Sequence, residues 1–204
     1  MKKKIFWVLF GFFSITIGLY PLKYFLMNGK VGILNAKPEW LLNHVAWYIA
    51  FYIHIILGGV SLLVGWLQFS YKLRSRNVKI HRYIGKIYVV SALFSSFSGS
   101  YIALFADGGF WASLGFSCLG IIWFCTTLMA YLTIWNHQIV KHQVLMIYSY
   151  AACFAAVTLR IWLPILILII GNYNTAYIIV AWLSWIPNLL VAYFVTNKIN
   201  PKIG

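Results

Sequence analysis

Acidic residues are nearly absent from this chain of 204 residues, in which Glu39 and Asp107 are the two carboxylate side chains. Charged residues of both signs make up 9% of the sequence. A soluble domain uses about 25% charged residues, chiefly on its surface. Because 63% of the residues are hydrophobic, most of the surface is expected to face lipid. The sequence therefore predicts an all-α integral membrane protein.

These shortages also disfavour several classes of function. Cation-coupled transporters depend on Asp or Glu within the membrane, and the apolar runs contain neither. The formal charge of +14 comes from basic residues between apolar runs, which is typical of membrane-surface charge and disfavours nucleic-acid binding. An odd number of cysteines without a CxxC pair disfavours a disulfide framework; they are Cys118, Cys125 and Cys153.

About six apolar runs are long enough to cross a hydrocarbon core that requires roughly 20 residues. The first lacks a signal-peptidase site of the A-x-A type and is interpreted as an uncleaved anchor. Asn28-Gly29 predicts a turn, Pro38-Glu39 a helix start, and Pro187 a kink in the last helix. No linker divides the chain, so a single transmembrane domain is expected over residues 1–204. The predicted helices span about 5–27, 38–70, 82–106, 110–135, 142–171 and 176–196.

Basic residues predict the orientation of these helices. Cytoplasmic loops of membrane proteins carry an excess of Lys and Arg. With both termini in the cytoplasm, the opposite side keeps only Lys23, Lys30 and Lys37 together with the two acids. We therefore expect an N-in/C-in topology. The cytoplasmic basic residues would be Lys2, Lys3, Lys4, Lys72, Arg74, Arg76, Lys79, Arg82, Lys86, Lys141, Lys198 and Lys202.

The third and fifth predicted helices both enter the membrane from the cytoplasm just behind a histidine, His81 and His142 respectively. This similarity favours two related hairpins, made of the second and third helices and of the fourth and fifth. Together these four helices are expected to form a central four-helix bundle.

Polar side chains at membrane depth are the first candidates for function, because ionisable groups in hydrocarbon are costly. At 1.5 Å per residue, His54 lies about 22 Å and Arg160 about 23 Å from the inner helix ends, level with Ser96, Ser98 and Ser100. We predict an outer ligand-binding site of His54, Ser96, Ser98 and Arg160. Alternatively, Arg160 extends to the outer headgroups. His54 could equally be a hydrogen-bonded core residue or a ligand of metal or haem.

A second cluster lies at the predicted cytoplasmic edge and contains His81, Arg82, His137 and His142. A solvated basic face explains it most simply. The alternative is a b-type haem with His81 and His142 as axial ligands and Arg82 near its propionates.

Several motifs carry a resemblance to a known family. They include His54 with Gly58-Gly59, and Gln68-Phe69. The others are His81-Arg82-x-x-Gly85-x-x-Tyr88, His142-x-x-x-Met146 and Ala156-Val157-Thr158-Leu159-Arg160. Over about residues 50–165, the chain resembles a bacterial family of predicted multi-helix membrane proteins of unknown function. The histidines on a central helix set are also loosely similar to two-haem b-type membrane cytochromes. The resemblance implies a multi-pass protein of the bacterial cytoplasmic (inner) membrane.

Three hypotheses follow, and none of them names a reaction. The first is a membrane protein that binds b-type haem or another small anionic or redox ligand between the second, third and fifth helices. The alternative is a non-catalytic accessory or assembly subunit of a larger membrane complex. The third is a pocket for a lipid, a quinone or an anionic metabolite at the level of Arg160. Membrane lipids are expected as partners in every case.

Overall fold

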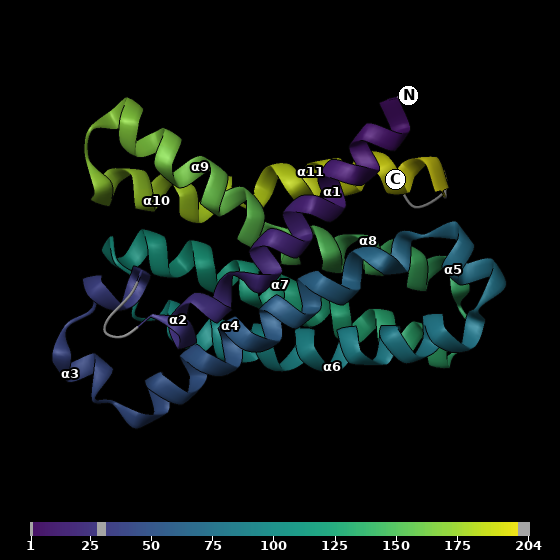
Figure 1. Ribbon diagram of the computed structural model, residues 1–204, viewed down its shortest axis with the longest axis horizontal. Coiled ribbons are helices and arrows are strands. Elements are labelled where there is room, and N and C mark those ends of the chain that lie inside the picture. Colours follow the sequence, from purple (N-terminus) through teal and green to yellow (C-terminus); the bar gives the residue numbers. More distant parts are fainter. Residues whose placement is uncertain (1, 28–31, 200–204) are drawn as a thin grey trace. The chain divides into compact units, whose positions relative to one another are not determined.

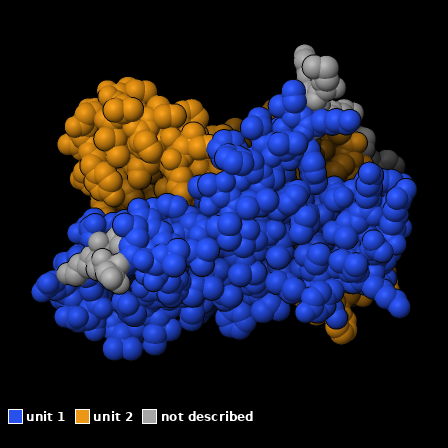
Figure 2. Space-filling model, in the orientation of Figure 1, with its two compact units in different colours: residues 1–102 blue, residues 103–204 orange. Residues whose placement is uncertain are grey.

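The computed structural model describes residues 2–27 and 32–199. All regular secondary structure among these residues is helical, which confirms the predicted all-α class. The chain divides into two compact units, residues 1–102 and 103–204 (Figure 2). The single domain and the central four-helix bundle stay predictions, and the turn predicted at Asn28-Gly29 lies outside the described residues.

In its described residues the first unit is built on the long helices α1, α4 and α6, which are joined by short helical segments (Figure 1). The predicted start at Pro38-Glu39 is confirmed, but the helix stops after Leu42, and the side chain of His44 caps the next one by accepting from Trp47 N. The basic segment from Tyr71 to Arg76 forms one further helix, which is capped by Ser70. The elements are α1 (Lys2–Leu19), η1 (Tyr20–Leu22), α2 (Lys23–Leu26), η2 (Gly32–Ala36), α3 (Glu39–Leu42), α4 (Val45–Gly65), η3 (Trp66–Phe69), α5 (Tyr71–Arg76) and α6 (Val78–Ala103).

Glycines let α1 and α4 approach each other closely. A Cβ atom added to Gly59 would lie 2.5 Å from the carbonyl oxygen of Gly18. Any larger residue at position 59 would therefore push the backbones of α1 and α4 apart. Small residues at such crossings are the usual means of packing helices in a membrane, where close van der Waals contact drives association. This contact anchors the helix that carries His54.

The second unit contains α7 (Gly109–Trp135), α8 (Ile139–Cys153), α9 (Ala155–Ile170), α10 (Tyr173–Leu183) and α11 (Ile186–Ile199). α7 packs against α8 and α10, and α8 also packs against α11. Pro187 lies in the first turn of α11, directly after a break from α10, which confirms the predicted kink. A second break, at Phe154 between α8 and α9, divides the helix predicted at 142–171.

Five helical stretches among the described residues are long and apolar enough to cross a membrane: Lys4–Leu26, Val45–Phe69, Gly109–Trp135, Ile139–Ile170 and Tyr173–Ile199. The remaining predicted span corresponds to α6, which has 26 residues and so a length of about 39 Å. α6 is less apolar than the others because it carries basic residues in its first turns and serines further along. The chain is an all-α polytopic membrane protein.

Candidate functional site

His54 of α4 is tied to α6 by reciprocal hydrogen bonds with Ser95. Its Nδ1 lies 2.9 Å from the carbonyl oxygen of Ser95, and because a carbonyl only accepts, Nδ1 carries the proton. The Ser95 hydroxyl donates to the carbonyl oxygen of His54 over 2.8 Å. The half-buried imidazole is therefore fixed in one tautomer within the first unit.

Small residues of both helices make room for this contact. A Cβ atom on Gly99 would lie 2.6 Å from Nδ1 of His54, and one on Gly58 would lie 3.0 Å from the Ser95 hydroxyl. Ser95 and Gly99 are four residues apart and share a face of α6. This Ser-x-x-x-Gly pattern is the sequence signal that could have identified Ser95, which the sequence analysis missed.

The serines predicted for the outer site instead bond to their own helix. Ser96 donates to the carbonyl of Ala92, Ser98 to that of Phe94, and Ser100 to that of Ser96. Each of these bonds returns to the backbone one turn earlier. Ser96 and Ser98 are buried, while Ser100 is half-buried.

Arg160 belongs to the second unit, where it lies half-buried on α9. Its Nη1 donates to the carbonyl oxygen of Ala156 over 2.8 Å, so the guanidinium bends towards the N-terminal end of its own helix. The predicted outer site joins Arg160 to His54 of the other unit, and it stays a prediction.

The other histidines occupy different environments. His142 of α8 is half-buried, and its Nδ1 lies 2.8 Å from the carbonyl oxygen of Ala130 on α7. His137 is exposed in the intervening turn with a φ of 57°. His81 and Arg82 lie in the first turns of α6, with Arg82 exposed. The proposed pairing of His81 with His142 joins residues of both units and stays a prediction.

Polar side chains also bridge the two helix breaks of the second unit. Asn188 Nδ2 donates to the carbonyl of Ala151 beside one break, and to the carbonyl of Ser184 at the other. The hydroxyl of Thr158 is a third acceptor within reach, so the two N–H groups of Nδ2 are shared among three acceptors. This hydroxyl in turn donates to the Ser184 carbonyl. Asn188 thus provides a hydrogen-bond donor to the backbone near Pro187. These bonds satisfy carbonyls that broken helices leave open in a membrane.

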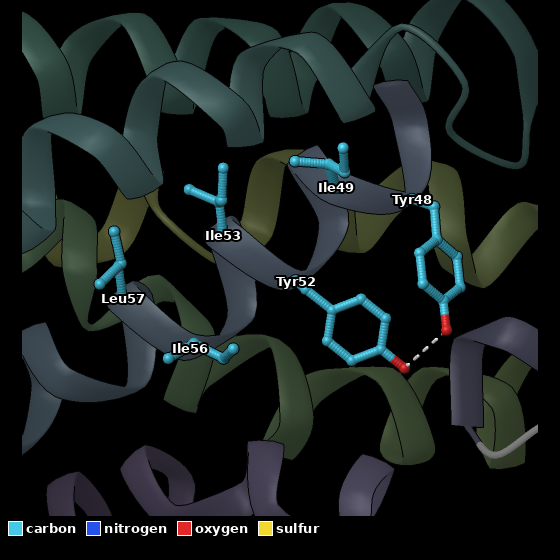
Figure 3. Close-up of a pocket in the computed structure, with 6 residues that line it drawn as sticks. All are labelled: Tyr48, Ile49, Tyr52, Ile53, Ile56 and Leu57. Atoms are coloured by element: carbon cyan, nitrogen blue, oxygen red, sulfur yellow. Dashed lines mark hydrogen bonds between the residues drawn. The ribbon is translucent and has the colours of Figure 1, made fainter. Parts of the chain in front are cut away.

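A shallow groove runs along the exposed face of α4 (Figure 3). Its wall is apolar except at the end nearer Val45, where the hydroxyl of Tyr48 donates to that of Tyr52 over 3.4 Å. An apolar face of this kind suits contact with lipid acyl chains. The groove is lined by Tyr48, Ile49, Tyr52, Ile53, Ile56 and Leu57.

Comparison with known proteins identifies a family. The chain is a multi-pass membrane protein, and it belongs to the family described as Predicted membrane protein (DUF2306), whose model matches residues 51–196. No curated protein and no solved structure matches the chain. The matched segment runs from α4 into α11 and includes His54, His81, His142 and Arg160.

A protein site for a bare metal ion usually needs three or more ligating side chains close together. Among the described residues, no group of three or more His, Cys, Asp and Glu side chains is placed to hold a metal ion. A haem iron differs from a bare ion because the macrocycle supplies most of its ligands, so the protein needs only one or two. A single imidazole oriented by a backbone carbonyl, as at His142, fits that need.

Proposed function

We propose that this protein binds b-type haem in a bacterial cytoplasmic membrane, with His142 as its first axial ligand. The orientation of the His142 ring carries the proposal. Its Nδ1 proton is held by the Ala130 carbonyl at 2.8 Å, which leaves the lone pair of a neutral imidazole on Nε2. Nε2 makes no hydrogen bond within the described residues. A ring nitrogen fixed by a backbone carbonyl is the usual support of a metal-bound histidine.

His54 is the second candidate ligand, since the Ser95 carbonyl fixes its Nδ1 proton in the first unit. His81 is the third, because the bis-histidine arrangement predicted from the sequence needs a partner for His142. The bound group would supply electron transfer by its iron. The chain would hold the imidazoles in place and surround the macrocycle with apolar helices.

Absorbance spectroscopy tests this proposal on the full chain purified in mild detergent. We expect a Soret band, a reduced-minus-oxidised α band and a pyridine haemochrome of b type. His142→Ala is expected to lower the haem content per protein by about tenfold or more, as expected for loss of an axial metal ligand. His137→Asn is the matched control, because it changes an exposed histidine at a positive φ that Asn tolerates.

Two results would contradict the proposal. One is wild-type protein without a Soret band after expression with added haem precursor. The other is a full haem content in the His142→Ala, His54→Ala and His81→Ala variants, each of which is compared with His137→Asn. The first result would favour the alternative function, a non-catalytic accessory or assembly subunit of a larger membrane complex.

A further inference from the structure

The side-chain amide nitrogen of a buried glutamine in the first unit has no partner among the described residues. Gln68 of η3 is only 9% exposed. Its Nε2 atom is buried, and it makes no hydrogen bond with any described residue. Buried polar groups are nearly always hydrogen-bonded, and each exception calls for a specific explanation. Gln68 is such an exception.

Gly85 lies beside Gln68, and the surrounding packing does not require a glycine at this position. Gly85 is inside α6, where glycine is less favourable than alanine. A Cβ atom at this position would meet one described atom within 4 Å, Oε1 of Gln68 at 3.6 Å, which is an ordinary van der Waals contact. Gly99 on the same helix differs, because His54 occupies the space of its missing side chain.

The two observations concern the same small region. The carboxamide oxygen of Gln68 borders the space beside Gly85, where no other described atom outside α6 lies within 4 Å of the position of a Cβ. Because the O and N atoms of an amide exchange places on a 180° flip, Gln68 can present its NH₂ group to this space. After the flip, the amide oxygen of Gln68 would occupy the buried position that Nε2 occupies now, without a hydrogen-bond partner. Proteins tolerate a buried oxygen without a partner better than a buried N–H without one.

The position within the fold indicates where a ligand would come from. Gln68 lies at the end of the span Val45–Phe69, and Gly85 lies seven residues into α6, so both are near the membrane surface predicted to be cytoplasmic. His81 and Tyr88 share the face of α6 that carries Gly85, four residues before it and three after it. A ligand dissolved in the membrane can reach this depth with its polar end.

We propose that Gln68 and Gly85 bind the head group of a membrane-soluble quinone. The Gln68 NH₂ donates to a ring carbonyl oxygen, and the absent side chain of Gly85 leaves room for the flat ring. A neutral amide suits a neutral carbonyl, because such a pair avoids the cost of desolvating a charge near hydrocarbon. The isoprenoid tail would extend into the lipid. The inference concerns binding and is independent of haem.

Quenching of tryptophan fluorescence measures this binding, because Trp66 lies in η3 two residues before Gln68. The probe is a ubiquinone analogue with a single isoprenoid unit, titrated into detergent-purified full-length protein, with menadione as a second quinone. We expect saturable quenching by the wild type. Gln68→Leu and Gly85→Ala are each expected to weaken binding by about tenfold or more, since a lost buried hydrogen bond or a filled ring site has that order of effect.

The controls separate binding from folding. Gly85→Ala should keep or raise the Tm, because its Cβ meets only an ordinary contact and alanine favours the helix. Gln138→Leu makes the same exchange at an exposed glutamine whose side chain makes no cap bond, and it should bind as the wild type does. Absence of saturable quenching in the wild type, or unchanged affinity in both site variants, would overturn the inference. Neither result bears on haem content, which is measured separately.

Discussion

Replacing Gly99 by alanine tests the contact between α4 and α6 directly. The new Cβ atom would lie 2.6 Å from Nδ1 and 2.8 Å from Cε1 of His54. Real Cβ atoms do not approach other atoms so closely, so either the imidazole or the two helices must move. In both cases the Nδ1 bond to the Ser95 carbonyl, now 2.9 Å long, is lengthened or lost.

The expected magnitude follows from three contributions. Forcing a methyl group into a packed interface costs about 1–3 kcal/mol. Loss of an interhelical hydrogen bond in a membrane protein costs about 0.6–1.7 kcal/mol. The higher helix propensity of alanine returns about 1 kcal/mol. We therefore expect Gly99→Ala to lower the free energy of unfolding by about 0.6–3.7 kcal/mol.

Thermal unfolding in detergent, followed by circular dichroism, is the assay. A loss of this size lowers the Tm of a chain of about 200 residues by roughly 1–15 °C. The same change in a His54→Ala background should cost much less, because the clash is then absent, and the double-mutant cycle isolates this coupling. A Tm equal to that of the wild type in the single variant would refute the described contact.

Two further predictions concern the second unit and the orientation. Asn188→Ala removes donors to three acceptors at the helix breaks and should lower the free energy of unfolding by about 1–3 kcal/mol. Exposed Asn136→Ala should leave unfolding unchanged, and equal Tm values for both variants would contradict the bridging role. In a cysteine-free background, Asn43→Cys should react with a membrane-impermeant maleimide in whole cells, and Ser75→Cys only after lysis, because N-in/C-in topology puts them on opposite sides. The reverse pattern would contradict the predicted orientation.

The helices were predictable where one apolar run meets clear end signals. α7 spans Gly109–Trp135 against a predicted 110–135, because Gly108, which has a φ of 88°, stands directly before it. The break at Phe154 was not predictable, since Cys153, Phe154 and Ala155 contain no helix breaker. Its neighbouring carbonyl at Ala151 is satisfied by Asn188, a contact across 37 residues of sequence that only the tertiary structure provides.

The candidate site was predictable in part for a similar reason. His54 and Arg160 stand out because ionisable residues are rare in apolar runs. The partner of His54 stands out less, since α6 carries serines at positions 91, 95, 96, 98 and 100, and only its spacing from Gly99 distinguishes Ser95 as the one that faces α4. The unpaired amide of Gln68 has no signal in the sequence, because its burial depends on how η3 packs.

The reduced-minus-oxidised spectrum of the purified full-length protein tests the central proposal most directly. Ligation by His142 predicts an α band of b type with a haem-to-protein ratio near one, which His142→Ala abolishes and His137→Asn preserves. A folded, haem-supplied wild type without any Soret absorbance would contradict it.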